Sequence, residues 1–210
     1  MKTKLLLVCG ILSSLLYLVM NIFIPMLWKE YSVVSQTVSE LSAIGAPTRP
    51  VWFAWGIVYA LLTLAFGVGV WQSAGQNRPL RIMGALFVAD GVISLFWPPM
   101  HLRGAEMTLT DILHIAFGVA WLLLSLLILS FSIAAFRERF RLYTIVTLGL
   151  FVVFGILTGI ESPNIAKNLP TPTIGIWERI NIAVFMLWVA VLAVVLMRTG
   201  LSPVREGAKK

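Results

Sequence analysis

The sequence predicts an all-α fold, a polytopic membrane protein built as a six-transmembrane-helix bundle. Two observations support this prediction. The 210 residues are 59% hydrophobic and 12% charged, whereas soluble domains have about 25% charged residues. The apolar residues also fall into six segments of roughly the 20 residues that cross a hydrocarbon core. We therefore expect residues 1–210 to form one integral-membrane domain with spans at 5–27, 51–73, 81–100, 111–136, 142–161 and 177–198.

The basic residues predict the orientation of this bundle. Eleven of the 16 Lys and Arg residues lie on the side that holds both termini. Because Lys and Arg are enriched on the cytoplasmic side of membrane proteins, we expect cytoplasmic N- and C-termini. The net charge of +7 has the same explanation, so we expect membrane lipids rather than nucleic acid as partners. The single cysteine, Cys9, excludes an intramolecular disulfide.

The loop after the first span carries a helix-start signal. Thr37 and Glu40 have the spacing of a capping box, and Val34, Val38 and Leu41 share one face of a helix. The pattern predicts a short amphipathic helix at the outer membrane surface. Two interpretations of its Ser39 and Glu40 remain open: they line a ligand pocket, or they only solvate and cap this helix.

The third span contains Asp90 near its centre. Ionisable groups inside a membrane are costly and mark candidate functional sites. We expect Asp90 to be buried and hydrogen-bonded to a neighbouring span, through Tyr17, Asn21 or Asn181. Asp90 is predicted to lie roughly 16 Å along the helix axis from His101, so the two do not share one metal ion.

Other ionisable residues cluster at the outer ends of the later spans. Asp111 and His114 share a face of the fourth span, although Thr108 and Asp111 also fit a capping box. Adjacent Glu178 and Arg179 point about 100° apart and therefore should have separate partners, with Glu161, Asp111 or Glu40 as the candidates for Arg179. We expect seven residues to surround one outward-facing cavity: Glu40, His101, Asp111, His114, Glu161, Glu178 and Arg179.

Three short stretches resemble a known family. They are Ser-Glu-Leu-Ser-Ala-Ile-Gly-Ala-Pro at 39–47, Pro-Met-His at 99–101 and Glu-Arg-Ile at 178–180. Together with six spans, they resemble the prokaryotic integral-membrane family catalogued as domain of unknown function 998, over nearly the whole chain. The resemblance implies a multi-pass protein of a prokaryotic cytoplasmic membrane and implies no reaction. A looser similarity is to seven-span membrane hydrolases that hold zinc with three histidines, whereas this chain has two.

Three functional hypotheses follow from these patterns. The first is a non-enzymatic protein that binds a lipid or small ligand from the outer leaflet, as sensor, accessory subunit or carrier, alone, as a homo-oligomer or with another membrane protein. The chain lacks Gly-x-Ser-x-Gly, His-Glu-x-x-His and glycine-rich phosphate-loop motifs, which favours this hypothesis over an enzyme. The second is a zinc-dependent lipid hydrolase of the outer leaflet, with His101, His114 and a carboxylate, Asp111 or Glu40, as metal ligands. The third is a proton-coupled transporter that uses Asp90.

Overall fold

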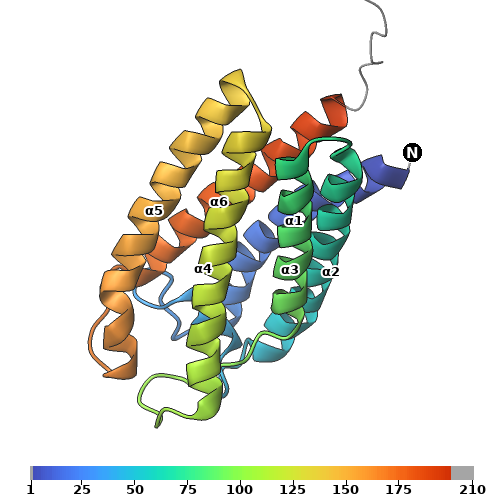
Figure 1. The fold of residues 1–210 in the computed structure, drawn as a ribbon. Coiled ribbons are helices and arrows are strands. Elements are labelled where there is room, and N and C mark those ends of the chain that lie inside the picture. The colour runs from blue at the N-terminus through green and yellow to red at the C-terminus, as the bar shows by residue number, and fades with distance from the viewer. Residues whose placement is uncertain (1, 200–210) are drawn as a thin grey trace, which may run out of the picture.

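The computed structural model describes residues 2–199 as a bundle of six α-helices (Figure 1). The helices are α1 (Lys2–Phe23), α2 (Arg49–Ser73), α3 (Arg78–Leu95), α4 (Leu109–Ala135), α5 (Glu138–Ala166) and α6 (Ile174–Thr199). Two short 3-10 helices, η1 (Ile24–Leu27) and η2 (Val38–Ser42), lie between α1 and α2. No β-strand is present within residues 2–199, which confirms the all-α prediction.

Five of the six helices are long and apolar enough to cross a membrane, namely all except α3. Helix α3 has 18 residues and contains Arg78, Arg81 and Asp90. It ends at Leu95 rather than at residue 100 as predicted from the sequence. The early end has a local cause: Pro98 and Pro99 follow within one turn, and a proline disfavours the helical conformation of the residue before it.

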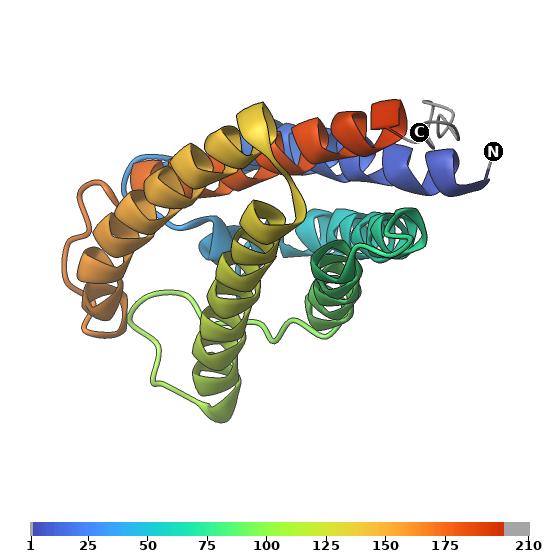
Figure 2. The same ribbon diagram turned by 45° about the horizontal axis from the view of Figure 1, so that its top comes forward.

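Consecutive helices run in alternating directions, so the loops gather at two ends of the bundle (Figure 1). The segments 24–48, 96–108 and 167–173 lie at one end, which we call the loop end. The short connections 74–77 and 136–137 lie at the opposite end, beside Lys2. Figure 2 shows α1, α5 and α6 along one side of the bundle and α2, α3 and α4 along the other.

Helices α2 and α3 pack with their backbones in contact. A Cβ atom added at Gly67 would lie 2.6 Å from the backbone nitrogen of Val88, and one at Gly84 would lie 2.6 Å from that of Trp71. Small residues at these positions allow close helix packing, as in membrane proteins generally. The aromatic core lies between this pair and α6, where Phe66, Phe87 and Trp188 are fully buried.

The amphipathic surface helix expected after the first span is not formed. The segment Val38–Ser42 is a 3-10 helix whose Val38, Glu40 and Leu41 are at most 2% exposed. The Glu40 side chain binds Arg103 of segment 96–108, and the backbone N–H of Val38 binds Glu178 at the start of α6. The apolar spacing that indicated a helix lying on the membrane therefore reflects burial within the loop end.

Candidate functional site

The candidate site is built on the 3-10 helix η2. Thr37 and Glu40 form the predicted capping box: Glu40 Oε2 accepts hydrogen bonds from the Thr37 backbone N–H at 2.7 Å and from the Thr37 hydroxyl at 3.1 Å. The carboxylate is then directed into the loop end, because its own helix holds it there. Ser39, on the same short helix, is half-buried, and its carbonyl oxygen accepts the Ser42 hydroxyl at 2.9 Å.

Arg103 forms a two-pronged ion pair with the buried Glu40. Its Nε donates to Glu40 Oε1 at 2.7 Å, and its Nη2 donates to Oε2 at 2.9 Å. The remaining donors bind the Thr171 hydroxyl at 2.6 Å and the carbonyl oxygen of Ser35 at 2.9 Å. One guanidinium therefore joins three separate segments of the loop end, as the planar fork of arginine allows.

The pair fixes the charge of Glu40. Burial alone would raise the pKa of this carboxyl. The hydrogen bonds from Arg103, the Thr37 backbone and Gln36 outweigh burial, so the pKa of Glu40 is lower than its ordinary value. Glu40 is therefore ionised at neutral pH, and Arg103 compensates its charge.

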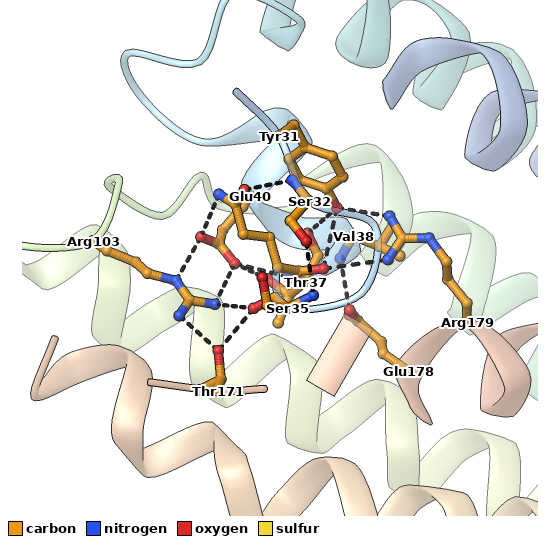
Figure 3. Close-up of polar contacts among 11 residues, drawn as sticks. Tyr31, Ser32, Ser35, Thr37, Val38, Glu40, Arg103, Thr171, Glu178 and Arg179 are labelled. Carbon is orange, nitrogen blue, oxygen red and sulfur yellow. Dashed lines mark hydrogen bonds and ion pairs between the residues drawn. The ribbon is translucent and has the colours of Figure 1, made fainter. Parts of the chain in front are cut away.

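The start of α6 holds the other side of the same loop. Glu178 Oε2 accepts the backbone N–H of Val38 at 2.6 Å. Arg179 donates to the carbonyl oxygens of Val33 and Gln36 and, at 2.6 Å, to the Tyr31 hydroxyl. Figure 3 shows these contacts together with those of Arg103; the eleven residues of this network, which we call the polar cap, are Tyr31, Ser32, Ser35, Gln36, Thr37, Val38, Glu40, Arg103, Thr171, Glu178 and Arg179.

Tyr31 is oriented by the same arginine. Its hydroxyl donates to the carbonyl oxygen of Thr37 at 2.7 Å and accepts from Arg179, whose guanidinium lies 5.6 Å from the ring centroid. Burial raises the pKa of Tyr31 to about 12, although the positive charge of Arg179 opposes that rise. Tyr31 is therefore a neutral structural donor at physiological pH.

Glu161 belongs to a neighbouring contact rather than to the polar cap. Its carboxylate accepts the backbone N–H groups of Thr173 and Ile174 at 3.2 and 3.1 Å, and the hydroxyl of Thr173. These N–H groups open α6, where a helix leaves donors without partners and favours negative charge. Glu161 therefore ties the end of α5 to the start of α6.

His101 and Asp111 form a second polar group at the loop end. His101 Nδ1 lies 2.9 Å from Asp111 Oδ2, and Asp111 Oδ1 accepts the His101 backbone N–H at 2.6 Å. The backbone and hydroxyl of Thr108 also donate to Asp111, which confirms the second capping box. An isolated parallel bridge joins His101 to Ile44, so this group is attached to the segment that follows η2.

His114 lies apart from that pair in its hydrogen bonding. Its Nδ1 lies 2.7 Å from the carbonyl oxygen of Pro98 and 3.1 Å from Nε1 of Trp97. With a proton this nitrogen donates to Pro98, and without one it accepts from the indole N–H of Trp97. The ring is 9% exposed and packs edge-to-face against Trp97. His114 therefore holds the chain after α3 against α4. Within residues 2–199 no group of three His, Cys, Asp or Glu residues is placed to hold a metal ion, so His114 does not join His101 and Asp111 as a third ligand.

Asp90 is buried, as predicted, but its expected hydrogen bond is not formed. The residue is 2% exposed, and its Oδ1 has no hydrogen-bond partner within the described residues. It lines a small cavity inside the bundle, and none of the expected partners Tyr17, Asn21 or Asn181 lines that cavity. Asp90 is thus a separate feature from the polar cap.

The structure therefore brings the predicted residues together in smaller groups than expected. Glu40, Glu178 and Arg179 meet in the polar cap, His101 meets Asp111, and Glu161, His114 and Asp90 have other surroundings. Neither the cavity beside Asp90 nor the one beside Trp71 is lined by any of the seven outer residues.

Arg103, Tyr31 and Thr171 were not predicted as site residues. The signal for Arg103 was the buried Glu40 itself, because a buried carboxylate needs a cation or several donors. Nothing in the sequence spacing identifies Tyr31 or Thr171, whose roles depend on how three loops meet.

These features define a class of protein. Five helices can cross a membrane, and large apolar side chains are exposed along α4 and α5, where a bilayer covers them. The molecule is a multi-pass helical membrane protein. Residues 11–195 match the family described as "Protein of unknown function (DUF998)", and the chain belongs to it. The chain matches no curated protein and no solved structure.

The three stretches that resemble this family meet in the structure. Glu40, in the first stretch, binds Arg103. Val38, the residue just before this stretch, donates its backbone N–H to Glu178 of the third stretch. Ile44, in the same stretch, donates its backbone N–H to the carbonyl oxygen of Met100 at 2.7 Å. Residues of these stretches therefore take part in the contacts that assemble the loop end.

Proposed function

We propose that the chain is a non-enzymatic protein of the cell membrane that binds a lipid or other small ligand at the His101–Asp111 pair. In this proposal both termini are cytoplasmic and the loop end faces outward. The proposal rests on one observation: Asp111 binds the backbone N–H and Nδ1 of His101, and within residues 2–199 no hydrogen bond is made by the other ring nitrogen, Nε2. Arg103 and Arg179 bind other groups of the loop end. The carboxylates of Glu40, Glu161 and Glu178 also accept hydrogen bonds from within the chain.

The chemistry of the pair indicates what His101 would bind. The ionised Asp111 carboxylate only accepts hydrogen bonds, so His101 Nδ1 carries a proton and donates to it. In the neutral ring Nε2 is then an acceptor, and it has no partner within residues 2–199. The His101 side chain is 28% exposed. A ligand with a hydroxyl or ammonium donor fits this nitrogen.

The surroundings of the pair favour a lipid over a soluble ligand. Four large, exposed apolar side chains are near the pair in the sequence. They are Phe96, Met107, Leu109 and Ile112. Apolar residues beside polar groups are typical of the membrane interface, where a headgroup and the start of its acyl chains lie side by side. A phospholipid with an ethanolamine or glycerol headgroup offers both a donor and an acyl chain.

Native mass spectrometry tests this function. Purified protein in mild detergent should retain a phospholipid, and His101→Ala should reduce the retained fraction on the order of tenfold, because a lost hydrogen bond costs about 1 kcal/mol or slightly more. Glu106→Gln is the matched control, since Glu106 is an exposed charge in the same loop and should retain lipid as the wild type does. Equal retention in wild type and His101→Ala would contradict the proposal.

A further inference from the structure

Asp90 faces a small cavity in the interior of the bundle. Ser13 from α1, Tyr59 and Thr63 from α2, and Met186 from α6 line the same cavity. Phe66, Phe87, Phe185 and Val189 complete its wall. The carboxylate is 2% exposed and its Oδ1 has no partner within the described residues. An ionised carboxylate left in this position costs several kcal/mol, so its charge needs compensation, by a proton or by a cation in the cavity.

The hydroxyl groups around Asp90 cannot all provide that compensation. The Ser13 hydroxyl donates to the carbonyl oxygen of Gly10 at 3.1 Å, and the Thr63 hydroxyl donates to that of Tyr59 at 3.0 Å. A hydroxyl has one proton and two lone pairs, so both oxygens retain only acceptor capacity. Tyr59 makes no hydrogen bond to Asp90 in the structure. The polar oxygens of the cavity are therefore suited to a cation.

The size of the cavity restricts which cation fits. Its volume is about 10 Å³, close to the space of a single water molecule. Calcium takes 6–8 oxygen ligands and magnesium retains several waters, so neither suits a space of this size with one carboxylate. A monovalent cation without its hydration shell would neutralise Asp90 and be coordinated by the neighbouring hydroxyl oxygens.

We propose that the cavity beside Asp90 binds one dehydrated monovalent cation, Na⁺, with the Asp90 carboxylate and the oxygens of Ser13, Tyr59 and Thr63 as its ligands. The site lies where α1, α2, α3 and α6 meet, and a bound ion links these four helices. It is independent of the ligand proposed at His101, because no hydrogen bond connects Asp90 to the loop end.

Thermal unfolding in detergent tests the proposal. The midpoint is measured in increasing NaCl, with choline chloride holding the ionic strength constant. Sodium at a hundredfold above its Kd should raise the wild-type midpoint by roughly 5–10 °C, as expected for a ligand that binds only the folded state of a chain this size. Asp90→Asn should remove the sodium response. A wild-type midpoint that is the same in sodium and choline would overturn the proposal, as would one that follows pH alone.

A second variant, Thr63→Val, tests the proposal even if Asp90→Asn does not fold. Thr63→Val keeps the shape of the side chain and removes one oxygen from the cavity, so it should weaken the sodium response. Thr158→Val is the matched control: Thr158 also donates to a carbonyl one turn earlier, on α5, and does not line the cavity. Binding of radioactive ²²Na⁺ to the purified protein should likewise be weaker in Thr63→Val than in the wild type, and unchanged in Thr158→Val. A full sodium response in Thr63→Val together with unchanged ²²Na⁺ binding would contradict the assigned ligands.

Discussion

Arg103 and Glu40 form the central contact of the loop end, joined by two hydrogen bonds of 2.7 and 2.9 Å. The residues are 63 positions apart in the sequence. Glu40 is 1% exposed and Arg103 is 19% exposed at their side chains. The same guanidinium also binds Ser35 and Thr171. The packing of the loops after α1, α3 and α5 therefore depends on one cation.

Removal of Arg103 should destabilise the protein strongly. Arg103→Ala leaves the buried Glu40 carboxylate without its cation, and the loss of one partner of a buried pair costs about 3 kcal/mol or more. Arg103→Lys should lie between this variant and the wild type, because an ammonium cannot reproduce the fork. Denaturant unfolding in detergent measures both. Lys29→Ala, an exposed basic residue of the neighbouring loop, should be unchanged, and equal stability of all three variants would refute the role of the pair.

Acid should weaken the same contact. The pKa of Glu40 in the folded protein is lower than the ordinary value of 4.5. A carboxyl with a lowered folded pKa stabilises the protein above its unfolded pKa, and this stabilisation is lost as the pH falls through the folded value. The thermal unfolding midpoint of the wild type should therefore decrease as the pH is lowered below about 4.5. Glu40→Gln should show a smaller fall over the same range, and identical pH profiles would contradict the argument.

Gly175 should not tolerate a side chain. A Cβ atom at this position would collide with the carbonyl oxygens of Val33 and Gln36, at the point where the Gly175 N–H binds the carbonyl oxygen of Val34. Gly175→Ala should lower the unfolding free energy by about 1–3 kcal/mol. Gly159→Ala is the matched control on α5, where nothing lies within 4 Å of the added atom. This control should be neutral or slightly stabilising, by up to about 1 kcal/mol.

Cysteine labelling on intact cells tests the proposed orientation. In a Cys9→Ser background, Glu106→Cys places a thiol at the loop end and Gln76→Cys places one at the opposite end. A membrane-impermeant maleimide should label position 106 from outside and position 76 only after permeabilisation. The reverse pattern would place the loop end in the cytoplasm. The C-terminal basic residues that contributed to the orientation argument, Arg205, Lys209 and Lys210, lie outside the described residues.

Much of the architecture could be predicted because it depends on local patterns. Apolar segments of bilayer length indicated six helices, and both capping boxes, at Thr37 and Thr108, are formed as expected. The 100° offset of Glu178 and Arg179 correctly indicated separate partners. The predicted 81–100 span is too long at its end, because Pro98 and Pro99 disfavour helical conformation in the residues before them and α3 ends at Leu95.

The grouping of the site residues could not be predicted to the same extent. Arg179 binds backbone carbonyl oxygens and Tyr31 rather than any of the expected carboxylates. The expected carboxylates are occupied by Arg103, by Thr108 and by the start of α6. Which donor reaches which acceptor depends on the paths of three irregular loops, and periodicity carries no information about such paths.

The most direct test of the proposed function is the site at which a lipid becomes attached. Purified protein is incubated with vesicles that contain phosphatidylethanolamine with a photoreactive headgroup, irradiated, digested and mapped by mass spectrometry. We predict adducts within residues 96–112, around His101, and their loss in His101→Ala but not in Glu106→Gln. Adducts confined to other segments, or unchanged by His101→Ala, would contradict lipid binding at the His101–Asp111 pair.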